Sequence, residues 1–136
     1  MAEVGNGVVE NTYFTSRKVE ETIISDFSED LKKRLLKYFK GRSAGFEDVP
    51  VLYPTEFSMR VLQFVREIPF GEVLSYSQIA RRLNTSPRAV GVALRANMVP
   101  VIVPCHRVVA KNGIGGYSAG TEIKKLLLEL EGIDIR

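Results

Sequence analysis

Two short helical patterns separated by a tight polar turn limit the possible folds of this chain more than any other segment. The first helix is expected over Ser77–Leu83, and Asn84-Thr85 supplies the turn. Ser86-Pro87 then opens a second helix, in the preferred order of N-cap followed by proline, which runs to about Arg95. Two short helices joined in this way predict a helix-turn-helix unit.

The second of these helices has a smooth surface. Ala89, Gly91, Ala93 and Ala96 are small, so the helix offers few side chains that could read base edges in a major groove. Small residues allow close packing on another helix, and they equally allow close approach to a narrow nucleic-acid groove. The helix alone favours neither interpretation.

The charge pattern favours the groove. The formal net charge is only +3, but no Asp or Glu occurs from Val73 to Thr121. Globular proteins normally mix charges of both signs, so a long stretch without carboxylates indicates a polyanionic partner, most commonly nucleic acid. The alternative is that the absence of Asp and Glu from this stretch arose by chance in a small basic domain. The stretch contains six basic residues: Arg81, Arg82, Arg88, Arg95, Arg107 and Lys111.

Several classes of protein are excluded. No apolar run approaches the roughly 18 residues of a membrane-spanning helix, and the first residues lack the basic and apolar regions of a signal peptide. The sequence contains one cysteine and one histidine, which rules out an internal disulfide and a closed zinc site. We therefore expect a cytoplasmic protein with no metal, no cofactor and no membrane partner.

The 136 residues divide near Pro50–Pro54 into a region 1–54 and a region 55–136. In the first region, Val4–Phe14 reads as extended, and Ser28 is expected to cap a helix over Glu29–Lys40. This region reads as a scaffold without chemistry of its own. The second region begins with a helix that Thr55 can cap. The expected fold class is α/β (α+β), with a small reduced N-terminal strand/helix domain and a C-terminal helical, winged-helix-like domain.

The chemistry is concentrated at Cys105-His106. The β-branched residues Val101–Val103 predict a buried strand or an extended core segment, which Pro104 ends directly before the cysteine. Cationic surroundings lower the pKa of a thiol and favour the reactive thiolate. Neighbours in an extended chain point to opposite faces, so a Cys–His interaction needs a turn or a bridging water. A buried structural cysteine beside a structural histidine is the alternative.

The last helix, expected over Glu122–Glu131, supplies a third candidate functional residue beside Cys105 and His106. Glu131 continues the apolar stripe of Ile123 and Leu127, just before Gly132. An acid in the last turn lies at the unfavourable end of the helix dipole, so a cation or an imidazole N–H is expected to hold it. A solvated terminal glutamate is the alternative.

These residues resemble the O6-alkylguanine-DNA alkyltransferases, over about residues 55–136. Residues 1–54 are short for that family's N-terminal domain and match it poorly. A related non-catalytic group has tryptophan at the cysteine position, and Cys105 favours the active enzyme. The matching motifs, in the family's order and spacing, are Phe70-Gly-Glu-Val-Leu-Ser-Tyr76, Arg88-Ala-Val-Gly91, Arg95-Ala-Asn97, Pro100, Pro104-Cys-His-Arg-Val108, Gly116-Tyr-Ser118 and Leu130-Glu-Gly132.

The resemblance implies a single-turnover alkyl transfer to Cys105. His106 would take the thiol proton, through a water, with Glu131 orienting the imidazole. For the flipped guanine, the Tyr76 hydroxyl would donate to N3 and the Ser118 backbone N–H to O6. The remaining assignments concern the pocket: the carbonyls of Cys105 and Val108 would accept the guanine amino group, Tyr117 and Pro100 would wall the pocket, and Asn97 would fix the turn before the cysteine.

The partner implied is double-stranded DNA containing O6-alkylguanine, bound by a monomer. Arg88 would enter the base stack in place of the flipped base, and Ala89, Gly91 and Ala93, with Arg95 nearby, would lie along the minor groove. Two other classes compete: a non-catalytic helix-turn-helix lesion binder, which has no need of the Cys-His-Glu set, and a cysteine hydrolase.

Overall fold

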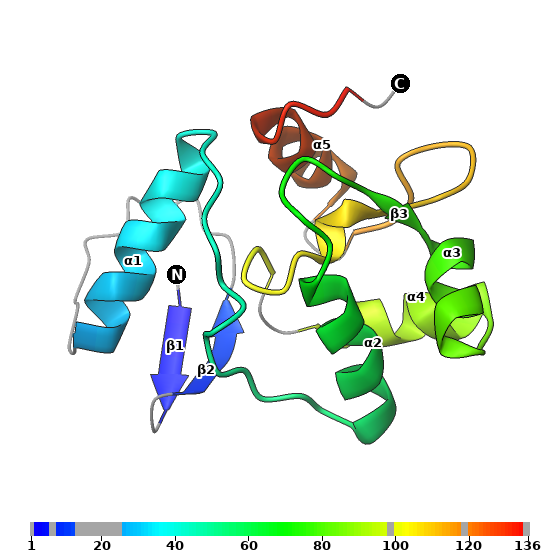
Figure 1. The fold of residues 1–136 in the computed structure, drawn as a ribbon, viewed down its shortest axis with the longest axis horizontal. Coiled ribbons are helices and arrows are strands. Elements are labelled where there is room, and N and C mark those ends of the chain that lie inside the picture. The colour runs from blue at the N-terminus through cyan, green and yellow to red at the C-terminus, as the bar shows by residue number, and fades with distance from the viewer. Residues whose placement is uncertain (1, 6–7, 13–25, 98–99, 118–119, 135–136) are drawn as a thin grey trace.

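The computed structural model describes residues 2–5, 8–12, 26–97, 100–117 and 120–134, with side chains from residue 29 onward. It contains five α-helices and two small two-stranded sheets among these residues. This mixture of helices and short strands is the expected fold class. Figure 1 shows the N-terminal elements on one side of the molecule and the helix-turn-helix on the other, with the last helix between them at the top of the view.

The N-terminal region forms a hairpin and one helix. Strands β1 (Ala2–Gly5) and β2 (Val8–Thr12) pair antiparallel, and α1 spans Asp26–Phe39. Ser28 therefore lies inside the helix rather than capping it, because the helix begins two residues before that position. Tyr13 and Phe14, which were also expected to be extended, lie outside the described residues.

The helix-turn-helix follows the sequence prediction closely. Helix α2 (Glu56–Arg66) is capped by Thr55, α3 (Tyr76–Leu83) by Ser75 and α4 (Pro87–Arg95) by Ser86, each through a side-chain oxygen that accepts a backbone N–H. Between α3 and α4, Asn84 adopts the left-handed conformation that ends the first helix. The apolar faces of α2, α3 and α4 share one core with the Val101–Val103 segment.

The segment before the cysteine is buried but is not a strand. Pro100 and Val103 form an isolated bridge around a tight turn, in which Val101 has a φ of 73°. Positive φ is costly for a β-branched residue, by about 1–3 kcal/mol. The β-branched run predicted burial correctly and conformation wrongly, because apolar periodicity alone does not distinguish an extended segment from a buried turn.

The turn continues into a short 3-10 helix, η1 (Cys105–Arg107), which leads directly into β4 (Val108–Val109). Strand β4 pairs in parallel with β3 (Leu74–Ser75), so the residues after the cysteine lie beside the start of α3. Helix α5 (Thr121–Leu130) ends one residue earlier than expected, and Glu131 is its C-cap. No helix in the described part of the chain is long and apolar enough to cross a membrane.

Candidate active site

Cys105 lies in the core at the start of η1, with only 6% of its surface exposed. Asn97 Nδ2 lies 3.1 Å from Cys105 Sγ and 3.2 Å from Val103 O, so one amide group binds both the thiol and the turn that precedes it. Because Asn97 follows the end of α4, it links the helix-turn-helix to the cysteine. This is the position expected for a residue that fixes the connecting turn.

Burial raises the pKa of the Cys105 thiol, although the Asn97 amide and the Lys124 charge oppose the rise. The basic stretch predicted the opposite direction. The prediction was wrong because Arg81, Arg82, Arg88 and Arg95 are exposed to solvent, and burial of the thiol has the larger effect on its pKa. A buried thiol that holds its proton needs a base close to it to become a nucleophile.

His106 is the neighbouring base, and it is fully buried. Its Nε2 lies 2.5 Å from Glu131 Oε2. The 3-10 turn of Cys105–Arg107 removes the geometric problem of adjacent extended residues, because the chain bends at the cysteine. Burial lowers the pKa of His106, with Glu131 opposing the change, and its Nδ1 has no hydrogen-bond partner among the described residues.

Glu131 is held from its other side as well. Its Oε1 accepts hydrogen bonds from Arg107 Nε at 2.8 Å and from the Gly71 backbone N–H at 2.9 Å. Burial alone would raise the pKa of Glu131, but the hydrogen bonds from His106, Arg107 and Gly71 outweigh it and lower that pKa to about 2. These donors compensate for the unfavourable helix end that the sequence analysis identified.

Arg107 therefore differs from the other basic residues of the carboxylate-free stretch. It is only 7% exposed, its Nη1 donates to Ile68 O at 2.7 Å, and its guanidinium lies 5.9 Å from the centre of the Phe70 ring. It is an internal partner of Glu131 rather than a surface cation.

Tyr38 is part of the same buried cluster, although the sequence analysis treated its region as a scaffold. It comes from α1 and is 0% exposed. Its hydroxyl donates to Glu131 Oε2 at 2.7 Å and lies 3.0 Å from His106 Nε2. A tyrosine on the apolar stripe of a helix was the available signal, because a buried tyrosine hydroxyl requires a polar partner.

Two tyrosines and a lysine surround the thiol on the other side. Burial raises the pKa of Tyr76 and of Tyr117, and interaction with Cys105 adds to both shifts. Lys124 of α5 is fully buried, with Nζ 2.6 Å from Val108 O and 3.0 Å from Gly116 O. Burial lowers its pKa to about 8. Lys124 was not predicted from the sequence, because a lysine in an amphipathic helix normally faces solvent.

The loop beside Tyr76 is tightly fitted. Gly115 has a φ of 76°, and a Cβ at that position would lie 3.1 Å from the Tyr76 hydroxyl and 3.1 Å from Ala110 N. Only glycine combines this conformation with this close approach. Pro100 is partly exposed and Val108 is buried beside the cysteine turn, whereas Ser118 lies outside the described residues.

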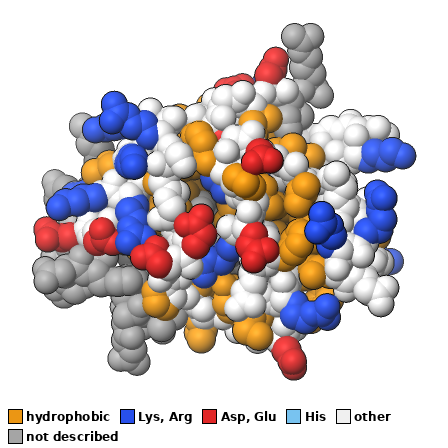
Figure 2. All heavy atoms as spheres, in the orientation of Figure 1, with side chains coloured by type: hydrophobic (Ala, Val, Ile, Leu, Met, Phe, Trp, Pro, Cys, Tyr) orange, Lys and Arg blue, Asp and Glu red, His pale blue; other side chains and the backbone are white. Residues whose placement is uncertain are grey.

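The exposed side of α4 carries Arg88, Val92 and Arg95, with Ala89 and Gly91 partly exposed between them. Ala93 differs from expectation: it is 2% exposed and packs in the core, so it cannot lie along a groove. A Cβ added at Gly91 would have nothing within 4 Å, so packing within the protein does not require glycine there. Helices α3 and α4 lie at one end of the molecule (Figure 1). At that end, the face seen in Figure 2 carries basic side chains and no acidic ones.

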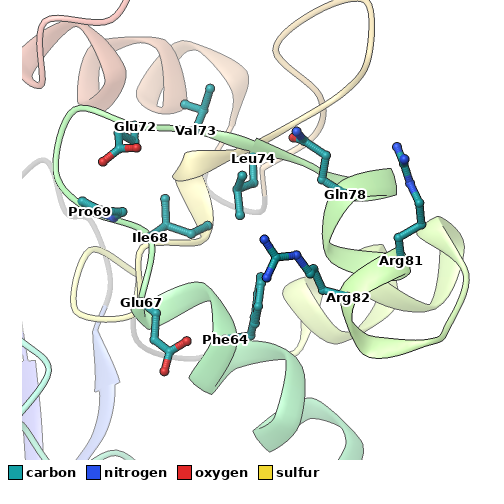
Figure 3. A pocket seen from close by; sticks show the side chains of 10 residues that line it. All are labelled: Phe64, Glu67, Ile68, Pro69, Glu72, Val73, Leu74, Gln78, Arg81 and Arg82. Carbon is teal, nitrogen blue, oxygen red and sulfur yellow. The ribbon is translucent and has the colours of Figure 1, made fainter.

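A separate hollow of about 510 Å³ lies between α2, β3 and α3. Figure 3 shows Phe64, Ile68 and Leu74 around it, with the Arg82 side chain pointing into it. None of the residues predicted to act on the substrate lines this hollow. Among the residues the structure describes, no group of three His, Cys, Asp or Glu side chains could hold a metal ion.

Comparison with known proteins gives a consistent result. The model of the "6-O-methylguanine DNA methyltransferase, DNA binding domain" family matches residues 56–133. The methylated-DNA–protein-cysteine methyltransferase of Metallosphaera sedula is 50% identical over 115 residues, which are 83% of this chain and 74% of that protein. The protein of the same description from Methanopyrus kandleri is 53% identical over 103 residues, 75% of this chain and 79% of that protein.

The fold is also similar to that of a solved protein–DNA complex. The structure described as Mycobacterium tuberculosis OGT in complex with DNA superposes with a TM-score of 0.78 at 35% identity. The superposition covers 96% of this chain and 85% of the other. It therefore extends beyond residues 56–133 into the N-terminal region.

Proposed function

Because the chain belongs to the family of the 6-O-methylguanine DNA methyltransferases, we propose that Cys105 is the residue that accepts the alkyl group from a damaged guanine. The chain binds DNA and repairs it by transferring the alkyl group to a cysteine of its own. Cys105 is the one cysteine in the sequence, and it lies next to a buried histidine–carboxylate pair. The position of Cys105 beside the His106–Glu131 pair is the observation that supports its assignment as the alkyl acceptor.

The transfer begins with the thiol proton. His106 Nδ1, the ring nitrogen turned away from Glu131, takes the proton through a water, while Glu131 holds the imidazole. The Cys105 thiolate attacks the alkyl carbon in line. A sulfur–carbon bond forms, the bond from that carbon to guanine O6 breaks, and its electron pair remains on O6.

The leaving guanine needs a proton and hydrogen-bond donors. The Tyr76 hydroxyl donates to N3, and the Ser118 backbone N–H donates to O6. The carbonyls of Cys105 and Val108 accept the amino group, and Tyr117 and Pro100 form the walls of the pocket. N1 of the released base takes up one proton from water, which balances the proton that His106 accepted, so the products are a stable thioether and a normal guanine. Each molecule therefore reacts once.

The base must leave the duplex before it can react, since a buried thiol cannot reach the O6 substituent of a base that is still stacked and paired. Arg88 enters the stack in place of the flipped base, and Ala89 and Gly91 lie along the minor groove with Arg95 nearby. The open space at Gly91 supports this placement, because a glycine that the protein's own packing does not require suits close approach by an external surface.

The regions 1–54 and 55–136 have different roles in the proposed function. Residues 55–136 carry DNA binding and alkyl transfer, and the match of the family model over 56–133 supports this division. Residues 1–54 support the site through Tyr38. The protein acts as a monomer and is located in the cytoplasm.

The test is a reaction with duplex DNA that carries a labelled methyl group on guanine O6. We expect one label per protein molecule and a mass increase of about 14 Da on the peptide that contains Cys105, with no further turnover. Label that stays on the DNA would indicate a lesion binder, and label released to solution would indicate a hydrolase.

Cys105→Ser is the matched variant. It should bind alkylated duplex as the wild type does and accept no label, because the hydroxyl of serine is a far weaker nucleophile than a thiolate at neutral pH. Normal transfer by this variant would overturn the assignment of Cys105.

A further inference from the structure

The hydroxyl of Tyr38 makes contacts that the packing of its ring does not explain. The ring lies edge-on to Phe46, Phe70 and His106, with centroid separations of 6.1–6.5 Å. A phenylalanine would make the same ring contacts. The hydroxyl adds a donor and an acceptor at a fully buried position, where an unpaired polar group is costly. It is tolerated because Glu131 and His106 lie beside it.

The protons of Tyr38, His106 and Glu131 can be placed from the distances between these side chains and from the charge of Glu131. Glu131 is ionised at neutral pH, since its pKa is lowered to about 2, so both of its oxygens only accept. His106 Nε2 lies 2.5 Å from Glu131 Oε2, and two acceptors cannot face each other at that separation. Nε2 therefore carries a hydrogen.

The Tyr38 proton is committed to the same carboxylate oxygen, at 2.7 Å. The oxygen of Tyr38 then faces the Nε2–H group of His106 at 3.0 Å as a second acceptor. Glu131 and Tyr38 together bind the Nε2–H form of the ring. In a neutral imidazole this leaves Nδ1 with its lone pair, and Nδ1 has no hydrogen-bond partner among the residues that the structure describes.

We propose that Tyr38 is a positioning residue for alkyl transfer, whose hydroxyl holds Glu131 in place and holds His106 in the tautomer whose Nδ1 can accept the thiol proton. The proposal rests on the function proposed above. It also makes α1 part of the active site, because the group that completes the cluster comes from that helix and lies outside residues 56–133.

The tautomer can be observed directly, because His106 is the one histidine in the chain. In a ¹⁵N-labelled protein, the shifts and proton couplings of its two ring nitrogens show which one carries hydrogen. The wild type should show a protonated Nε2 and a bare Nδ1 near neutral pH. A wild-type spectrum with a bare Nε2 would overturn the proposal without any variant.

Tyr38→Phe removes the hydroxyl and keeps the ring. We expect a mixture of tautomers in its spectrum. We also expect the maximal rate of reaction with free O6-benzylguanine to fall about tenfold, with little change in the concentration that gives half of that rate. Apart from Tyr38 itself, the groups whose charge acts on His106, namely Glu131, Arg107 and Lys124, are unchanged in this variant.

Tyr53→Phe is the matched control. The Tyr53 hydroxyl also accepts a hydrogen bond, from Arg66 Nη1 at 3.1 Å, but it belongs to no part of the proposed site. This variant should keep the wild-type tautomer and rate. A similar loss of rate in both variants, or a wild-type rate in Tyr38→Phe, would show that the Tyr38 hydroxyl has no positioning role.

Alkyl transfer and the role of Tyr38 can be tested separately. If the wild type takes no methyl group from duplex DNA that carries O6-methylguanine, the proposed function is refuted, whereas the histidine spectrum tests the tautomer without a substrate. Thermal unfolding of each variant shows whether a change in rate reflects a loss of fold.

Discussion

Glu131 is the residue on which the buried polar contacts of this molecule converge. It accepts hydrogen bonds from Tyr38, His106, Arg107 and the Gly71 backbone. Only the ionised form can accept all of them, so protonation breaks the cluster. The pH dependence of stability should therefore report on this carboxylate.

The sign of that dependence follows from the lowered pKa, which is about 2 in the folded protein against an ordinary value of 4.5. Ionised Glu131 stabilises the native state above the ordinary value, and this stabilisation is lost as the pH falls toward 2. Glu131→Gln should lower the free energy of unfolding at pH 7 by about 3 kcal/mol, and the difference from the wild type should narrow below about pH 4.

Urea unfolding of both proteins across this pH range checks the prediction. Glu129→Gln, two positions earlier and on the exposed side of α5, serves as the control. A difference between Glu131→Gln and wild type that does not change with pH would mean that the carboxylate charge contributes nothing to stability.

For single residues, the sequence predicted which side chains are reactive better than it predicted their burial and contacts. Cys105, His106 and Glu131 were recognisable from motif and helix position, and the structure brings the last two together. The direction of the thiol pKa was wrong, because it depends on burial and not on the charges nearby in sequence. The Tyr38 contact joins residues 93 positions apart, which no local pattern can predict.

At the scale of elements, α4 is the part whose action on DNA can be separated from the chemistry. Arg88 is exposed in the first turn of the helix, whereas Cys105 is buried. Arg88→Ala should slow the repair of duplex DNA, because it removes the wedge that we propose for base flipping and one cation. It should leave the reaction with free O6-benzylguanine nearly unchanged, because a free base needs no flipping.

Rates measured on the two substrates check this expectation. Arg82→Ala removes one exposed cation from α3 without removing the wedge, and it should weaken duplex binding only modestly. Equal losses on both substrates for Arg88→Ala would place Arg88 in the pocket or in the fold instead.

The elements also show where sequence patterns are reliable. The caps Thr55 and Ser86 were predicted correctly because a cap is a local hydrogen bond, whereas Ser75 was not predicted as a cap and the predicted Ser28 cap was wrong. The prediction that the small residues of α4 share one exposed face was partly wrong. Residues two positions apart in a helix lie on different faces, so Ala93 packs in the core while Gly91 is partly exposed. The Val101–Val103 turn depends on a positive φ that its residue types disfavour.

At the scale of the whole molecule, the position of Cys105 predicts that the reacted protein is less stable than the unreacted one. The thiol belongs to the main hydrophobic core and receives the Asn97 amide. An added methyl or benzyl group overpacks this site and displaces that contact, at a cost of about 1–3 kcal/mol. The melting temperature should fall by roughly 3–10 °C.

Melting curves and hydrogen exchange before and after reaction with O6-benzylguanine provide the measurement. Faster exchange should appear first between the end of α4 and η1, where Asn97 binds the turn. Cys105→Ser treated with the same compound is the control and should not change. An unchanged or higher melting temperature for the benzylated protein would mean that the pocket has spare room.

The buried single thiol has a consequence for how a population of these molecules behaves. Each reacted chain has lost its one free sulfhydryl, so the thiols counted after denaturation equal the molecules still able to react. Capacity, rather than turnover rate, then limits how many lesions a cell can clear before new protein is made. A plot of repaired sites against lesion dose should rise linearly and stop abruptly, and a thiol reagent would read the remaining reserve.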